Sequence, residues 1–277
     1  MFDLFHYSFI IRGFEAGIIV AIIAPLIGIF LVLRRYSLIA DTFAHVSLGG
    51  IALGLFLGWN PVLTALIVTC AASLGIDRLR TSKKVYGESA LAIFLSGSLA
   101  FAVVLLSLAK GFNTNLFSYL FGSITTVAPS DVTIIAILGI VVISTLVIFM
   151  KELISVTFDE EFAKVSGIRV KLVNIIFILL TALTVSLSIP IVGILLISAL
   201  IVLPVVTALQ FKKSFLKTII YAEIVSIFSV ISGIIASFYL NLSTGGTIVL
   251  IMVVLFILAL LRNTFSVNET TENRGTI

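Results

Sequence analysis

The sequence predicts an all-α, polytopic integral membrane protein, and two observations carry that prediction. Hydrophobic residues make up 60% of the 277 positions and charged residues only 11%, against about 25% charged in an ordinary soluble domain. Stretches without Asp, Glu, Lys or Arg recur along the whole chain, at residues 16–33, 89–109, 132–150, 172–211 and 224–261. A membrane-spanning helix needs about 20 apolar residues, so the last two stretches are long enough to cross twice. A single soluble core is excluded.

Breaks in the apolar pattern divide the chain into nine candidate spans. The tripeptide at 59–61 (WNP) is a turn with an interfacial aromatic residue, and residues 241–246 (NLSTGG) continue a helix poorly. Pro190 lies inside the run 172–211, and because proline ends or kinks a helix, we expect a boundary beside it. The candidate spans are residues 15–33, 37–58, 61–77, 89–109, 131–150, 172–188, 191–210, 218–239 and 246–261.

One further uncharged segment complicates the number of spans. Residues 111–130 (GFNTNLFSYLFGSITTVAPS) are aromatic-rich but broken by Gly, Asn and Pro. We expect them to form an interfacial or re-entrant piece on the outer side. The sequence therefore predicts eight or nine membrane-spanning helices.

The distribution of basic residues predicts the orientation. If the nine segments cross alternately, Arg12 and Lys110 fall on one side, and the other 15 of the 17 Lys and Arg residues fall on the opposite side. The positive-inside rule makes that opposite side cytoplasmic, with the N-terminus outside and the C-terminus inside. The cytoplasmic set is Arg34, Arg35, Arg78, Arg80, Lys83, Lys84, Lys151, Lys164, Arg169, Lys171, Lys212, Lys213, Lys217, Arg262 and Arg274. This skew explains the net charge of +4 without a nucleic-acid partner, and none is expected.

We expect one transmembrane domain over residues 1–277. It has an outer tail at 1–14, a cytoplasmic segment at 151–171 and a cytoplasmic tail at 262–277. No cleavable signal peptide pattern accompanies the first apolar run. The single cysteine, Cys70, rules out an intramolecular disulfide and a thiolate metal cluster within one chain.

Asp41 and His45 stand out in the second candidate span, at "SLIADTFAHVSLGG". They are four residues apart, so on a helix they share one face. Asp41 is six residues beyond Arg35, about 9 Å along a straight helix, which places the pair in the cytoplasmic half of the membrane. An ionisable residue costs roughly 2.5–3.5 kcal/mol at a bilayer centre. One interpretation is a structural hydrogen-bonding pair, helped by Thr42 and Ser47. The other is a transport pathway, because intramembrane ionisable residues usually line one, and carboxylate with neutral imidazole suits zinc or manganese.

Three other features, two in the spans and one in the outer tail, are less informative. Glu223 has no obvious partner nearby in sequence, and we expect a buried structural carboxyl group. Gly49 and Gly50 supply either a helix break or a close helix contact. His6 lies in the outer tail and is given no role.

Residues 155–172 (SVTFDEEFAKVSGIRVKL) form the other informative stretch, in the longest cytoplasmic loop. They predict a short amphipathic helix, with an apolar stripe at i, i+4 and i+7 and a glycine at a C-cap position. The stripe, the polar face and the glycine are Phe158, Phe162 and Val165; Asp159, Glu160 and Lys164; and Gly167. A helix lying on the membrane is one interpretation, but its polar face would normally be rich in Lys and Arg. The mainly acidic face favours docking of a soluble partner.

Motifs of nucleotide hydrolysis and proteolysis are absent from the sequence. It contains no G-x-x-x-x-G-K-[ST], no H-E-x-x-H and no G-x-S-x-G. The chain is therefore interpreted as non-catalytic, and an intramembrane enzyme is disfavoured. A secondary transporter or channel stays open as an alternative, since it would run on an ion gradient and need no docking helix.

Four stretches occur in order along nearly the whole chain: residues 33–54 (LRRYSLIADTFAHVSLGGIALG), 115–132 (NLFSYLFGSITTVAPSDV), 155–168 (SVTFDEEFAKVSGI) and 192–209 (VGILLISALIVLPVVTAL). Together they resemble the membrane permease subunits of bacterial ABC importers for zinc and manganese, the ABC-3 family. The resemblance implies a permease of the type II ABC importer kind in the cell membrane.

The resemblance also implies partners and site residues. The expected partners are a second copy of this chain, two ATP-binding cassette ATPase subunits below and a metal-binding receptor outside. The family's metal-contacting Asp and His match Asp41 and His45, and its ATPase-coupling segment matches residues 158–167. No permanently bound cofactor is expected, because the metal is the transported substrate. ATP hydrolysis would belong to the separate subunit.

The choice of metal follows from the same comparison of motifs. Manganese-type members tend to read like GDAISHAVLPG at this site, and zinc-type members like ADTLSHVSLAG. The sequence here, ADTFAHVSLGG, is closer to the second. Zinc is therefore expected, with manganese or iron as the alternative.

Overall fold

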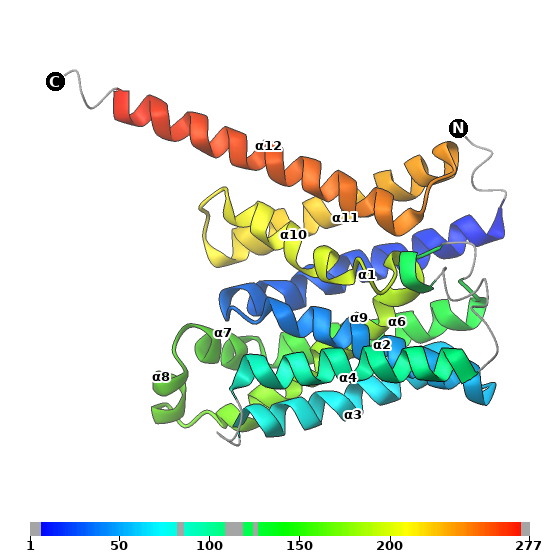
Figure 1. Ribbon diagram of the computed structural model, residues 1–277. Coiled ribbons are helices and arrows are strands. Elements are labelled where there is room, and N and C mark those ends of the chain that lie inside the picture. Colours follow the sequence, from blue (N-terminus) through cyan, green and yellow to red (C-terminus); the bar gives the residue numbers. More distant parts are fainter. Residues whose placement is uncertain (1–6, 82–85, 109–118, 124–126, 273–277) are drawn as a thin grey trace.

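A computed structural model of the chain describes residues 7–81, 86–108, 119–123 and 127–272, with their side chains except at 81 and 263–272. Every regular element within these residues is a helix, and Figure 1 shows the helices packed side by side as a bundle. Several features discussed above lie outside the described residues: His6, Lys83, Lys84, Lys110, Arg274 and residues 111–118 and 124–126.

Eight helices in the described residues are long and apolar enough to cross a membrane. They are α1 (Ser8–Leu33), α2 (Ser37–Leu57), α3 (Pro61–Thr81), α4 (Gly87–Leu108), α6 (Pro129–Ile148), α9 (Val170–Val192), α11 (Phe215–Leu240) and α12 (Thr244–Glu272). Shorter helices in the described residues include α7 (Met150–Phe158), α8 (Glu160–Val165) and α10 (Ile197–Leu209). The predicted polytopic all-α architecture is confirmed.

The seventh predicted span, 191–210, does not form a full-length helix. Helix α10 has 13 residues, about 20 Å at 1.5 Å per residue, against a hydrocarbon core of about 30 Å. The preceding residues 193–196 are non-helical. Two of them form backbone hydrogen bonds with residues 119 and 120. Ile194 N–H donates to Tyr119 O at 2.9 Å, and Leu195 N–H donates to Leu120 O at 3.2 Å.

The break predicted beside Pro190 is present but begins three residues later, at Gly193. Helix α9 continues through Pro190 and ends at Val192, with Gly193 after it at φ 85°. The proline lies in the last turn, where the missing N–H removes a bond close to the helix end and interrupts little. Pro190 O accepts from Ser123 N–H at 3.3 Å, so this carbonyl is used outside the helix.

The ends of the helices gather at two ends of the bundle. One end, called here the α8 end, holds the α1–α2 turn, α7, α8 and the start of α11, joined by ring contacts of Phe215 with Phe30 and Phe158. The far end holds the break after α9, where Gly193 and Gly245 approach the segment at Phe121 and Gly122. Figure 1 shows α1 starting at the far end and α12 running toward the α8 end. The basic residues at the ends of α1 and α3 and around α7, α8 and α10 therefore share the α8 end.

Candidate metal site and docking segment

The α1–α2 turn sets the position of α2. Arg35 takes a left-handed conformation, φ 58°. Tyr36 N–H donates to Leu31 O at 2.8 Å and Arg35 N–H donates to Val32 O at 3.1 Å, the two bonds of a Schellman motif. Because both bonds close the end of α1, only three residues separate Leu33, the last residue of α1, from Ser37, the first of α2. The turn therefore has little slack between the two helices.

Asp41 and His45 lie one helical turn apart on α2, as the sequence predicted. Asp41 lines an open groove, whereas the His45 ring is partly buried and its Nδ1 atom fully so. Within the described part of the chain, neither side chain has a hydrogen-bonding or ionic partner. A structural pair would bond to each other or to a neighbour. Neither of these bonds is present among the described residues.

Nearby polar residues on α2 are satisfied. Thr42 Oγ1 donates to Leu38 O at 2.9 Å, within the helix. Ser47 is fully buried and forms hydrogen bonds with Thr69 of α3 at 2.7 Å and Ser186 of α9 at 3.2 Å. This hydroxyl cluster ties α2 to two helices one half-turn beyond His45.

The Gly49–Gly50 pair makes a close helix contact and no break. Helix α2 continues unbroken to Leu57. A Cβ added at Gly50 would lie 2.5 Å from Ala65 Cα and 3.0 Å from Thr64 O. The absence of a side chain lets α3 approach α2 closely, so α2 is held tightly on the side away from the groove.

The groove beside Asp41 has a volume of about 480 Å³ and is open on one side. Helices α2, α10 and α12 line it, through Ser37, Leu38, Asp41, Ser198, Ala199, Val202, Leu203, Val249 and Val253. His45 lies one turn deeper on the same face and does not line the groove. No group of three or more His, Cys, Asp or Glu side chains forms a metal cluster among the residues described.

Glu223 is separate from this pair, on α11. Both of its carboxyl oxygens are buried, and they have no hydrogen-bond partner in the described structure. The expected burial of this carboxyl group is confirmed. No polar contact among the described residues indicates what it does.

The segment predicted as one amphipathic helix forms two helices. Asp159 ends α7 and caps α8, since its Oδ1 accepts from Phe162 N–H at 2.9 Å. Phe158 is therefore the last residue of α7, while Phe162 and Val165 lie on α8. All three apolar side chains remain exposed, at 64%, 64% and 88%. The predicted stripe survives as an exposed apolar surface, although its residues do not share one helix.

Two of the charged residues of α8, Glu160 and Lys164, pair with each other. Lys164 Nζ lies 2.8 Å from Glu160 Oε1, and the hydrogen bond to Glu160 raises the pKa of Lys164. At the other end, Gly167 takes φ 84° and donates to Lys164 O at 3.1 Å, while Ile168 N–H donates to Ala163 O at 3.0 Å. This is a second Schellman motif, and it confirms the predicted C-cap glycine.

Comparison with known proteins identifies the family. The model of the ABC 3 transport family matches residues 6–263. The chain belongs to the ABC 3 transport family. Its relatives in this family include the "High-affinity zinc uptake system membrane protein ZnuB" of Haemophilus influenzae, 33% identical over 89% of this chain and 94% of the relative.

Other members of the ABC 3 transport family carry manganese in their names. The "Manganese transport system membrane protein MntC" of Listeria monocytogenes is 33% identical over 93% of this chain and 92% of its own. Among solved structures, PsaBC from Streptococcus pneumoniae in complex with Fab is similar to this chain. Its TM-score is 0.83 at 28% identity, over 92% of both chains. The family and fold are thus shared by relatives named for two different metals.

Arg34 has contacts that the sequence did not predict. In the sequence it is only one of the charges that predict the orientation. In the structure its guanidinium is largely buried at the α8 end and contacts two other helices. The available signal was the pair Arg34–Arg35 directly at the end of a span, but the sequence does not tell which of two neighbouring arginines turns inward.

Proposed function

We propose that this chain is the transmembrane permease subunit of an ATP-driven importer for a divalent transition metal, with zinc as the substrate. The observation that carries the proposal is the pair Asp41 and His45, whose polar atoms lack a protein partner on a membrane-spanning helix. Carboxylate and imidazole are metal ligands, and intramembrane ionisable residues mark substrate pathways. Two ligands bind a metal weakly enough for it to leave, as transport requires.

A second copy of the chain completes the pathway in this proposal. The groove at Asp41 is lined by one charged residue and mostly apolar side chains, and it is open on one side. An open groove of this kind exposes Asp41 to lipid in a single chain, which is costly for a carboxylate. A homodimer that covers the groove removes this cost and encloses the passing metal.

The ATPase docks at the α8 end. Phe158, Phe162 and Val165 are exposed there beside paired charges, and an exposed aromatic pair is typical of an interface anchor. The basic residues share this end, so the positive-inside rule makes it cytoplasmic. The far end then faces outward, where a metal-binding receptor delivers the substrate. The N-terminus lies outside and the C-terminus in the cytoplasm.

Zinc is preferred over manganese on the motif ADTFAHVSLGG alone. The ligand pair suits either metal, and one of the two relatives is named for zinc and the other for manganese. The test is uptake into vesicles holding this chain with its ATPase and receptor. We expect ATP-dependent zinc uptake, with manganese competing poorly. Preferential manganese uptake would contradict the choice of metal, and uptake without ATP that follows an ion gradient would establish a secondary transporter.

The orientation has an independent test. Reporter tags at residue 87 and at the C-terminus should report the cytoplasm, and a tag at residue 114 should report the outside. A C-terminus on the outer side would overturn the orientation and, with it, ATPase docking at the α8 end.

A further inference from the structure

We propose that Arg34 is a positioning residue that links the α7–α8 segment to α2, so that a shift of the docking segment moves the helix that carries Asp41 and His45. The inference rests on the function proposed above. It concerns how movement at the ATPase interface reaches the metal pathway, and it assigns that task to one buried side chain.

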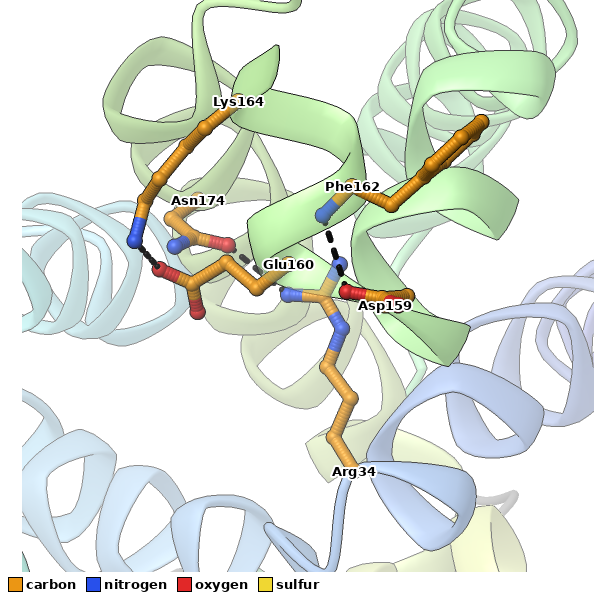
Figure 2. Close-up of polar contacts among 6 residues, drawn as sticks. All are labelled: Arg34, Asp159, Glu160, Phe162, Lys164 and Asn174. Atoms are coloured by element: carbon orange, nitrogen blue, oxygen red, sulfur yellow. Dashed lines mark hydrogen bonds and ion pairs between the residues drawn. The ribbon is translucent and has the colours of Figure 1, made fainter. Parts of the chain in front are cut away.

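Arg34 joins three elements at the α8 end. Its Nε donates to Thr157 Oγ1 of α7 and its Nη1 donates to Asn174 Oδ1 of α9, both at 2.9 Å. The guanidinium carbon lies 4.7 Å from the centre of the Phe177 ring. Figure 2 shows the side chain rising from the end of α1 toward Asn174, beside α8. A planar guanidinium holds such a geometry more rigidly than an ammonium group does.

The contacts of Arg34 lie close in sequence to both candidate sites. Thr157 immediately precedes Phe158 and lies two residues before Asp159, the N-cap of α8. On the other side, the closed turn at 35–36 connects Arg34 to α2, and Asp41 lies four residues beyond Ser37, about 6 Å along α2. The guanidinium of Arg80 covers the Tyr36 ring at 4.2 Å, which fixes the same turn against α3.

Glu160 offers Arg34 a second partner. Nη2 of Arg34 is buried and has no hydrogen bond to any described residue. Glu160 and Arg34 together line two cavities of about 230 and 280 Å³. Burial lowers the pKa of Arg34, and the charge of Glu160 opposes that effect. Figure 2 shows the Glu160 carboxylate turned to Lys164 instead. In the movement proposed here, the Glu160 carboxylate turns from Lys164 to the guanidinium of Arg34.

A brace that merely stabilises the fold would have the same contacts, so the test must measure coupling. The complete complex of permease, ATPase and receptor is reconstituted in vesicles, and metal transported per ATP hydrolysed is measured beside assembly and basal ATP hydrolysis. Arg34→Met should lower the transport-to-hydrolysis ratio by at least about fivefold, the lower range of energetic coupling between sites. Assembly and basal hydrolysis should stay near wild type.

Matched variants sharpen the result. Arg35→Met removes the same charge from the same turn, but Arg35 is exposed and forms no side-chain hydrogen bond with the described residues, so the ratio should not change. Asn174→Ala and Arg34→Lys each remove part of the link and should give intermediate ratios. Glu160→Gln should lower the ratio, and adding it to Arg34→Met should cause no further loss, because residues in one network are not additive.

An unchanged ratio in assembled Arg34→Met complexes would overturn the proposal. If Arg34→Met fails to assemble, Asn174→Ala and Arg34→Lys decide, and unchanged ratios in both would overturn it equally. A loss in Arg35→Met equal to that in Arg34→Met would also reject it, since charge alone would then explain the effect. A wild-type complex that transports no metal with ATP would instead reject the proposed function itself.

Discussion

The polar side chains of α2 and those of α8 are arranged in opposite ways. Asp41 and His45 lie on a largely buried helix without a protein partner, whereas Glu160 and Lys164 are exposed and pair with each other. The apolar residues reverse the pattern. On α2 they are mostly buried, and around α8 Phe158, Phe162 and Val165 are exposed. In a membrane protein, unpaired polar side chains within a span and exposed apolar side chains outside the spans are the candidates for function.

The physical reason is the cost of each mismatch. An unpaired ionisable group in a bilayer costs several kcal/mol unless a partner or water relieves it. An exposed aromatic pair costs less but leaves apolar area that a partner can bury. Surface ion pairs such as Glu160–Lys164 contribute little to stability. The metal site is therefore sought among the charges of α2, and the docking surface among the apolar residues around α8.

The largest effect is expected at Asp41 and His45. Asp41→Ala and His45→Ala should each lower zinc uptake, normalised to assembled complex, by at least about tenfold, or about 1.4 kcal/mol. The double variant should be hardly worse than either single variant, because both would contact the same metal. Thr42→Val is the matched control on the same helix, since among the described residues the hydroxyl group that it removes bonds only to Leu38 O. Near-normal uptake in the single variants would make the pair a packing device.

The next effect concerns the exposed aromatic residues. Phe162→Ala, and more strongly Phe158→Ala with Phe162→Ala, should weaken ATPase association by at least about tenfold, as the loss of an interface anchor does. The permease should still fold, because both side chains are 64% exposed. Leu216→Ala, with 68% exposure at the same end of the bundle, is the control and should have little effect. Unchanged association with reduced membrane attachment would favour a helix that lies on the bilayer.

The elements of the fold were predictable where hydrophobicity decides the structure. Eight of the nine apolar segments became long helices because length and apolar content suffice for a span. The failures have local causes. Pro190 was expected to end a helix, but in the last turn of α9 its missing N–H matters little. The split at Asp159 was missed because its side chain caps a new helix, while the apolar spacing alone indicates a continuous one.

The candidate site was also predictable only in part: its residues could be predicted from the sequence, but their contacts could not. Asp41 and His45 could be found because charges are rare in the spans, and their i, i+4 spacing fixed a common face. Their lack of protein partners could not be found, because it depends on which side chains of α3, α9, α10 and α12 lie nearby. Arg34 was missed for the same reason, since its contacts with Thr157 and Asn174 join residues more than 120 positions apart.

A smaller effect, on stability, is expected from the close packing of α2 against α3. Gly50→Ala places a Cβ 2.5 Å from Ala65 Cα, a backbone atom that cannot move aside cheaply. We expect a loss of about 1–3 kcal/mol in stability, typical of overpacking, seen as a lower Tm of the purified permease. Gly97→Ala in α4 is the control, because a Cβ there meets nothing within 4 Å. Equal Tm values for the two variants would show that α2 and α3 separate without cost.

The smallest effect is expected from the cap of α8. Asp159→Ala removes the acceptor for Phe162 N–H, and loss of an N-cap costs about 1 kcal/mol. A helix of six residues has few other bonds to hold it, so its first turn should fray and display Phe162 less well. ATPase association should fall by about fivefold, the equivalent of that energy.

Asp159→Asn distinguishes a capping role from direct recognition of the carboxylate. Asparagine accepts the same backbone bond about as well as aspartate, so this variant should retain nearly wild-type association if capping is the whole role. If Asp159→Asn is as weak as Asp159→Ala, the negative charge itself contacts the ATPase. The polar face around α8 would then carry binding energy, and the contrast between functional charges on α2 and structural charges near α8 would fail at that residue.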